Sequence, residues 1–510
     1  MKIASRNTLI LWFLVILKFL LQYHLIHPVY ELHRDEFLHL DLGQHLAWGY
    51  LSVPPFTAWI SKLIYLLGNS VFWVKFFPAL FGALAVVVVW KSIRELGGNL
   101  FALVLGATGV LFSVLLRINT LYQPNSFDIL CWTTLYLVLI NYFNSEKPKW
   151  LYFAAVVFAL GFLNKYNISF LLLGLFPALL LTRQRKIFLQ KKLYLAVLLG
   201  LVLVSPNLLW QYYNDFPVVD HMQELAETQL VHIDRTDFLK SQVLFFLGSF
   251  FVILAALYAF WVYEPFWKYR VFFWAFFFTL TVFMILKAKD YYAIGLYPVY
   301  IAFGCVYLEQ ILKRDWKKYL RPVAMAIPVL LFIPMSQLIF PNKTPEYIVS
   351  HSKRYKDSGL LRWEDGKNHA IPQDFADMLG WKELARQVDS VYRSLPQDEH
   401  TLVFCDNYGQ AGAINFYSHE GVKAVSFNAD YMNWIDLDRR YNNLIRVKTY
   451  KKQVEEDEEA AYFKSSAIAG SIKNPYAREH KTRIVIYKDA KIDISKKIRM
   501  EILEEKEALK

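Results

Sequence analysis

Long apolar runs alternate with short, often charged loops from about residue 8 to residue 341. Most runs approach the roughly 20 residues that a helix needs to cross about 30 Å of hydrocarbon. The pattern predicts a mainly α-helical, polytopic membrane bundle of about eleven spans, with an upper limit of about thirteen. The expected spans are 8–26, 76–93, 100–116, 127–143, 151–163, 168–182, 193–210, 238–262, 271–286, 291–311 and 322–340.

Two segments depart from this alternation. Residues 29–73 are too long for a connector and mix acids and histidines with Phe, Leu and Trp, which predicts interfacial helices in the first outer loop. From about residue 342 the chain turns polar, and residues 342–510 suffice for one small soluble domain. Strand patterns at 401–404 and 483–487 and a helix pattern at 411–417 predict an α/β fold there. The expected domains are therefore 1–341 and 342–510.

Composition agrees with a membrane protein, because 55% of the residues are hydrophobic and 17% are aromatic. The net charge of +12 comes mostly from every second loop, such as 183–192 and 313–321, so the positive-inside rule explains it without a nucleic-acid partner. This bias predicts a multi-pass protein of the cell (inner) membrane with a cytoplasmic N-terminus and an extracytoplasmic C-terminal domain. The first apolar run lacks a cleavage pattern and is interpreted as a signal anchor. The three cysteines exclude a disulfide framework.

Several cations contradict the topology rule, because they fall at or near the outer ends of spans. A cation at the hydrocarbon boundary is costly unless it is paired or matched to an anion. The phosphate of a lipid is an anion at that depth, so we expect at least two of these residues to bind phosphate. The alternative is that each side chain extends to the lipid headgroups. The set is Arg34, Lys75, Arg117, Lys165, Lys287 and Lys289.

An acidic pair, Asp35-Glu36, follows the first span. Sugar transfer from a phosphate carrier needs a carboxylate that accepts a proton and cations that stabilise the departing phosphate. A solvated surface pair is the alternative interpretation. His33, His39 and His45 lie nearby but lack the spacing of a zinc site, so the metal ligands are unknown and a divalent metal is left open. Tyr291 and Tyr292 are candidates for stacking on a sugar ring.

An ordered series of motifs resembles the family 39 glycosyltransferases, which include protein mannosyltransferases and aminoarabinose lipid A transferases. The resemblance covers most of the membrane part. Two C-terminal segments, 375–381 and 407–413, are similar to bacterial members of the family but indicate no substrate. The membrane motifs are His33–Glu36, His39–Gly43, Val53–Pro55, Lys75–Gly82, Pro124–Asp128, Leu163–Tyr166, Lys289–Tyr292 and Leu296–Pro298.

The resemblance implies an inverting transferase of the C-type fold, in which residues 1–341 form the transmembrane glycosyltransferase domain. It would move a hexosyl or pentosyl group from a polyprenyl-phosphate-linked donor to a lipid, glycan or protein acceptor outside the membrane. A polytopic transporter or lipid-linked sugar flippase is the alternative. In the aminoarabinose branch a Glu-Lys pair precedes the proline, whereas Ser52-Val53 stand here. The phosphate-binding lysine of that branch is therefore missing, and either another cation substitutes for it or the donor site differs.

The implied site combines these residues with those of the charge pattern. Catalysis is expected from Asp35 with Glu36 beside it. Binding of the donor phosphate is expected from Lys75, Arg117, Lys165 and Lys289. Substrate binding is expected from Arg34, Asp128, Tyr291 and Tyr292.

Overall fold

A computed structural model describes residues 6–228, 230, 233–396, 400–450 and 453–508. Contacts between Cα atoms divide the chain into two compact units. Unit 1 comprises Met1–Leu25, Val53–Thr57 and Phe72–Phe340, and unit 2 comprises Ile26–Ser52, Ala58–Val71 and Pro341–Lys510. The segment after the first helix thus groups with the C-terminal residues. The sequence-based division into domains at residue 341 stays a prediction.

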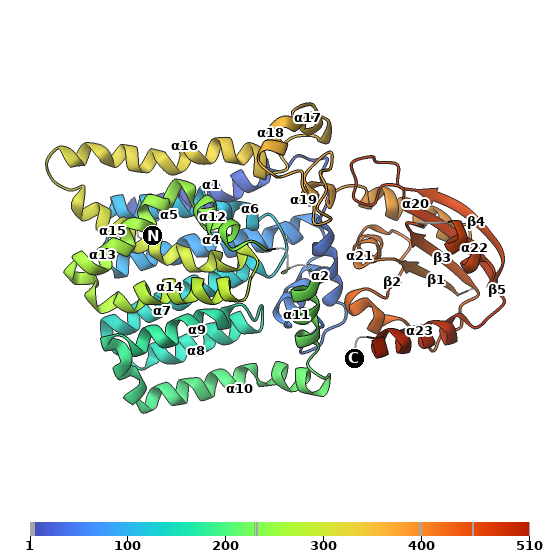
Figure 1. Cartoon of the computed structure of the whole chain (residues 1–510), viewed down its shortest axis with the longest axis horizontal. Coiled ribbons are helices and arrows are strands. Elements are labelled where there is room, and N and C mark those ends of the chain that lie inside the picture. The colour runs from blue at the N-terminus through green and yellow to red at the C-terminus, as the bar shows by residue number, and fades with distance from the viewer. Residues whose placement is uncertain (1–5, 229, 231–232, 397–399, 451–452, 509–510) are drawn as a thin grey trace, which may run out of the picture. The chain divides into compact units, whose positions relative to one another are not determined.

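Unit 1 is a bundle of apolar helices, most of which run alongside one another (Figure 1). Short 3-10 turns connect several of them, including η5 (Asp290–Leu296). The helices are α1 (Arg6–His24), α4 (Val71–Glu95), α5 (Leu100–Leu111), α6 (Val114–Ile118), α7 (Asn125–Ser145), α8 (Lys149–Phe162), α9 (Ile168–Leu180), α10 (Lys191–Tyr213), α11 (Pro217–Thr228), α12 (Arg235–Phe245), α13 (Phe250–Val262), α14 (Arg270–Ile285), α15 (Tyr297–Ile311) and α16 (Arg321–Ile339).

Seven helices in the described part of the chain are long and apolar enough to cross a membrane, or nine if each of two bent helix pairs counts as one span. The chain is therefore a multi-pass membrane protein. The predicted spans 100–116 and 151–163 coincide with α5 and α8, which are shorter apolar helices. The number of eleven spans stays a prediction.

Small residues let the helices of unit 1 approach closely. A Cβ atom on Gly304 of α15 would lie 1.9 Å from the carbonyl oxygen of Val252 on α13, and one on Gly174 of α9 would lie 2.0 Å from Oγ1 of Thr279 on α14. Close backbone approach is the usual means of packing helices in lipid, where apolar burial alone distinguishes little between protein and hydrocarbon. The core between these helices is rich in aromatic side chains, and Trp132 is completely buried.

Unit 2 contains a five-stranded mixed sheet in the order β2-β1-β3-β5-β4. Strand β1 lies between β2 and β3 and pairs with both in parallel, whereas β5 pairs antiparallel with β3 and β4. Alternate residues of the strands pack against helix α23 through a cluster that includes Leu402, Tyr487 and Ile498. The strands are β1 (Thr401–Cys405), β2 (Ala424–Ser426), β3 (Asn443–Lys448), β4 (Phe463–Ser471) and β5 (Arg483–Ala490).

The helices of unit 2 come from both ends of the chain. The predicted helix at 411–417 and the predicted strands at 401–404 and 483–487 are present, each within a somewhat longer element. Figure 1 shows α21 following β1 and α20 beside the sheet. The helices are α2 (Arg34–Leu42), most of α3 (Phe56–Leu66), α17 (Pro345–Ser350), α18 (Ser352–Asp357), α19 (Gln373–Ala376), α20 (Trp381–Arg393), α21 (Tyr408–Tyr417), α22 (Gln453–Ala460) and α23 (Ile494–Ala508).

Candidate active site

The acidic pair lies in the first turn of α2, and the local sequence explains why the helix begins there. The ring nitrogen Nδ1 of His33 accepts the backbone N–H of Asp35 at 3.2 Å, and the carboxylate of Glu36 accepts the backbone N–H of His33 at 2.7 Å. This reciprocal arrangement is a capping box, which satisfies backbone donors that the helix leaves unpaired. Glu36 is completely buried. Glu36 thus stabilises the start of α2 through its hydrogen bond to the backbone.

The carboxylate of Asp35 is held from the C-terminal part of unit 2. The hydroxyl of Tyr408 donates to Oδ1 of Asp35 at 2.7 Å, and the guanidinium of Arg34 lies over the Tyr408 ring, 4.3 Å from its centre. The Asp35 side chain still keeps 39% of its surface exposed. The sequence indicated Asp35 and Arg34 but missed Tyr408, although it lies in the segment 407–413 that resembles other family members.

Two opposing effects act on the charge of Asp35. Burial raises its pKa, whereas positive charge on His33, the hydrogen bond from Tyr408 and the charge of Arg34 lower it. The net pKa lies below the ordinary value of an aspartate. Asp35 is therefore ionised at neutral pH and able to accept a proton.

Helix α2 packs directly on α21, because α21 carries glycines one turn apart on the facing side. A Cβ atom on Gly409 would lie 2.5 Å from Cγ of Arg34, and one on Gly412 would lie 2.6 Å from Cβ of Phe37. At the far end of α2, Asp41 accepts hydrogen bonds from Asn415 at 2.7 Å and from Tyr431 at 2.6 Å. These contacts fix both ends of the helix that carries Asp35.

The other C-terminal segment of the family pattern, 375–381, holds the residues just before α2. The carboxylate of Asp377 lies 3.9 Å from Nε2 of His33 and 3.1 Å from the guanidinium of Arg478. The backbone N–H of Trp381, at the start of α20, donates to the carboxylate of Glu31 at 2.7 Å. Both segments therefore contact the chain around Asp35.

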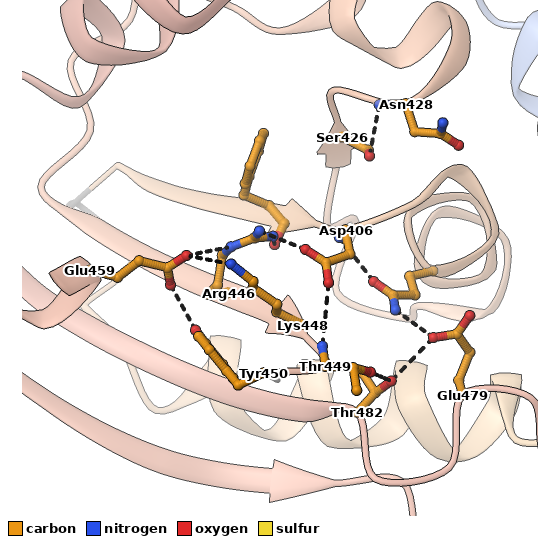
Figure 2. A network of polar contacts seen from close by, with 12 residues as sticks. Asp406, Ser426, Asn428, Arg446, Lys448, Thr449, Tyr450, Glu459, Glu479 and Thr482 are labelled. Carbon is orange, nitrogen blue, oxygen red and sulfur yellow. Dashed lines mark hydrogen bonds and ion pairs between the residues drawn. The ribbon is translucent and has the colours of Figure 1, made fainter. Parts of the chain in front are cut away.

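A network of polar contacts fixes the turn between β1 and α21 (Figure 2). The guanidinium of Arg446 donates to Asp406 at 2.7 Å and lies 3.4 Å from the carboxylate of Glu459. Asn407 caps α21 by accepting the backbone N–H groups of residues 409 and 410, while its amide donates to Glu479 at 3.2 Å. Tyr408 is the next residue, so this network determines where its side chain begins.

Two of the predicted cations of unit 1 meet at Thr120. The ammonium of Lys75 donates to the Thr120 carbonyl at 3.0 Å, and the guanidinium of Arg117 donates to the Thr120 hydroxyl at 2.8 Å. Arg117 also donates to the carbonyl of Ile339 at 2.9 Å. The buried Lys18 of α1 donates to Gln22 at 2.7 Å and to the carbonyl of Ala79 at 3.1 Å, so the structure places it inside the protein and not in lipid.

Lys165 forms a second group with the predicted substrate-binding residues. Its ammonium donates to Asn125 at 2.7 Å and lies over the rings of Tyr292 and Tyr291, at 4.1 and 5.3 Å from their centres. Asp128 is buried and accepts hydrogen bonds from Asn167 at 2.8 Å and from Trp132 at 3.1 Å. Asn167 also donates to the carbonyl of Tyr292.

Lys289 acts on Lys165 through its charge. Burial lowers the pKa of Lys165 to about 8, the carboxylate of Asp128 opposes this shift, and the positive charge of Lys289 adds to it. Four of the predicted residues, Lys165, Asp128, Tyr291 and Tyr292, are thus neighbours, and Lys289 is close enough to influence them.

Comparison with known proteins identifies what the chain resembles. Residues 52–210 match the family described as dolichyl-phosphate-mannose-protein mannosyltransferase. A lipid A galacturonosyltransferase, RgtD, from Rhizobium johnstonii is 27% identical over 224 residues, which are 43% of this chain and 46% of that protein. The chain thus matches about half the length of this curated relative.

The fold extends the match over nearly the whole chain. The crystal structure of ArnT from Cupriavidus metallidurans bound to undecaprenyl phosphate has a TM-score of 0.62 at 13% identity, and the comparison covers 94% of this chain and 98% of ArnT. The apo structure of the same protein has a TM-score of 0.60 at 12% identity. These comparisons confirm the resemblance to C-type glycosyltransferases that the sequence motifs indicated.

These similarities favour the enzyme interpretation, because the matched family is described as a mannosyltransferase and the curated relative as a galacturonosyltransferase. The comparisons assign no role to a single side chain of this protein. Asp35 belongs to unit 2 and the four predicted phosphate-binding cations belong to unit 1, so their convergence in one pocket stays a prediction. Among the residues that the structure describes, no group of three His, Cys, Asp or Glu side chains is suited to holding a metal ion.

Proposed function

We propose that the chain is an inverting glycosyltransferase, which moves a hexosyl or pentosyl group from a polyprenyl-phosphate carrier to a hydroxyl of a lipid, glycan or protein. Two relatives support the choice of substrates. ArnT of C. metallidurans was solved with undecaprenyl phosphate, and RgtD is named as a galacturonosyltransferase of lipid A. Undecaprenyl phosphate carries the kind of lipid-anchored phosphate that the cations predicted at the membrane boundary are suited to bind.

Asp35 is the proposed general base. Its carboxylate takes the proton of the acceptor hydroxyl while the hydroxyl oxygen attacks the anomeric carbon. The bond between that carbon and the phosphate oxygen breaks, and the polyprenyl phosphate departs with the bonding electrons. One displacement inverts the anomeric configuration. Because a phosphate is a good leaving group, the mechanism needs no general acid.

Cations stabilise the departing phosphate in this proposal. Lys75 and Arg117, which meet at Thr120, form one candidate group, and Lys165 with Lys289 forms the other. A fixed cation in a site that excludes water contributes several kcal/mol to a transition state that gains negative charge, roughly 3 to 4 kcal/mol for one good donor. Tyr291, Tyr292, Arg34 and Asp128 are proposed to position the substrates.

The proposed location follows from the basic loops. If those loops are cytoplasmic, the N-terminus is cytoplasmic, and the C-terminal domain lies outside the inner membrane for an odd number of spans. No step of the proposed mechanism uses a metal. Measuring turnover with EDTA and with added Mg²⁺ tests whether a divalent metal is required.

The observation that carries the proposal is the state of Asp35, an ionised and partly exposed carboxylate at the start of α2. The test is complementation of a deletion strain with the wild-type chain, with Asp35→Asn, or with Asp357→Asn, which replaces an exposed aspartate of α18. Mass spectrometry of envelope glycolipids and glycoproteins should find a sugar-modified product with the wild type and with Asp357→Asn, and none with Asp35→Asn at equal membrane abundance.

Two results would contradict the proposal. If Asp35→Asn restores the product at the normal level, Asp35 is not the base. If deletion removes only the outward movement of a lipid-linked sugar and the purified chain forms no glycosidic bond, the flippase alternative is correct.

A further inference from the structure

The proposed mechanism does not account for Tyr408, the tyrosine of unit 2 that donates a hydrogen bond to Asp35. The two residues are 373 positions apart, and the hydroxyl of Tyr408 lies 2.7 Å from Oδ1 of Asp35. Nothing in the sequence-based mechanism uses a residue of the C-terminal domain. We propose that Tyr408 is a positioning residue for catalysis, which orients the Asp35 carboxylate, so that the C-terminal domain completes the active site. This inference rests on the proposed function of Asp35.

The position of Tyr408 is fixed by the contacts of the residues beside it in the chain. Tyr408 is the first residue of α21, directly after the cap residue Asn407, whose amide donates to the buried carboxylate of Glu479. Gln410 donates to the other oxygen of Glu479 at 2.6 Å. The carboxyl ends of parallel strands are where α/β folds usually place functional side chains. Here the residues that follow β1 place the hydroxyl of Tyr408 against α2.

The hydrogen bond fixes the orientation of the Asp35 carboxylate, because Oδ1 accepts the hydroxyl of Tyr408 at 2.7 Å. Nδ1 of His33 lies 3.9 Å from Oδ2 of the same carboxylate. Burial and the negative charge of Asp35 raise the pKa of Tyr408 above its ordinary value. The hydroxyl therefore stays protonated, and it acts as a donor throughout the working pH range.

The ring of Tyr408 has a separate role from its hydroxyl. Arg34 lies on the ring face at 4.3 Å, in the geometry of a cation–π contact. Tyr408→Phe keeps this contact and removes only the hydroxyl. The variant consequently tests orientation of Asp35 without disturbing the packing of α2 on α21.

Any pH effect of the variant must be judged against all charges that face Asp35 within unit 2. Within the described part of unit 2, these groups include His33, Arg34 and His39 on or beside its own helix, and Asp377 and Tyr408 on the packed C-terminal elements.

The experiment compares the purified wild-type chain, Tyr408→Phe and Tyr417→Phe in detergent. The donors are synthetic undecaprenyl-phosphate sugars, and the acceptor is the unmodified form of the product that the complementation test identifies. Tyr417 is the matched control, because it is also on α21 and its hydroxyl accepts the backbone N–H of Leu32 at 3.4 Å. Tyr408→Phe should lower kcat about tenfold, the effect of one hydrogen bond to an ionised group, with KM unchanged. The acid limb of its pH profile should move up by about one pH unit, because the hydrogen bond no longer stabilises the ionised carboxylate.

The outcomes separate this inference from the proposed function. If Asp35→Asn is inactive but Tyr408→Phe keeps the wild-type kcat and acid limb, Asp35 is the base and Tyr408 does not position it. If Tyr408→Phe loses activity only together with a lowered melting temperature and an unchanged acid limb, the role of Tyr408 is structural and the inference is wrong. If Asp35→Asn is fully active, the proposed function itself fails.

Discussion

Gly412 of α21 offers a test of how closely the helix that carries Asp35 must be held. A Cβ atom at this position would lie 2.6 Å from Cβ of Phe37 and 2.5 Å from the hydroxyl oxygen of Tyr431. Carbon atoms in good contact are about 3.5 to 4.0 Å apart. Gly412→Ala therefore requires α2 to move by about 1 Å, because the backbone of Phe37 lies just behind its Cβ atom, at 3.1 Å.

The displacement has two expected consequences. Overpacking of this kind costs about 1–3 kcal/mol of stability. A shift of about 1 Å in a catalytic group can lower the rate by about 10²-fold. The shift also disturbs the hydrogen bond from Tyr431 to Asp41, which fixes the other end of α2. We expect turnover to fall by one to two orders of magnitude (about 10- to 100-fold) while the protein still inserts into the membrane.

The measurements are the initial rate of donor consumption and the thermal unfolding temperature of the purified chain in detergent. Gly200→Ala is the matched control, because that helical glycine of α10 has its nearest neighbour, Cβ of Ala155, at 3.8 Å and has room for a methyl group. Unchanged turnover and unfolding temperature in Gly412→Ala would refute the close packing of α2 on α21 as the support of Asp35.

Two further predictions concern single charges. Burial raises the pKa of Asp41 to about 7, so the folded chain keeps a proton that the unfolded chain loses near pH 4. The unfolding temperature should therefore fall between about pH 4 and 7 and stay constant at higher pH. Asp41→Asn should flatten this slope, and an unchanged slope would assign the pH dependence to another group. Lys165→Gln should weaken binding of undecaprenyl phosphate about tenfold or more in native mass spectrometry. The control Lys147→Gln, at an exposed lysine of another loop, should leave binding unchanged, and equal affinities of the two variants would exclude Lys165 from the donor site.

The sequence alone determined that this is a multi-pass membrane protein, and it located several of the helices and strands. Apolar runs of membrane length predicted the helices, since hydropathy acts over a local window that a linear pattern reveals. The strand at 401–404 and the helix at 411–417 followed from similar local patterns. The sequence also indicated Asp35 as a candidate, because the motif that contains it consists of residues adjacent in the chain.

Only the tertiary structure decided which residues surround Asp35. Residues 26–52 group with the C-terminal residues and not with the helices on either side of them in sequence. The hydrogen bond from Tyr408 to Asp35 joins positions 373 residues apart. No local periodicity encodes such a pair, because it depends on the path of the whole chain and on the two glycines that let α2 and α21 approach.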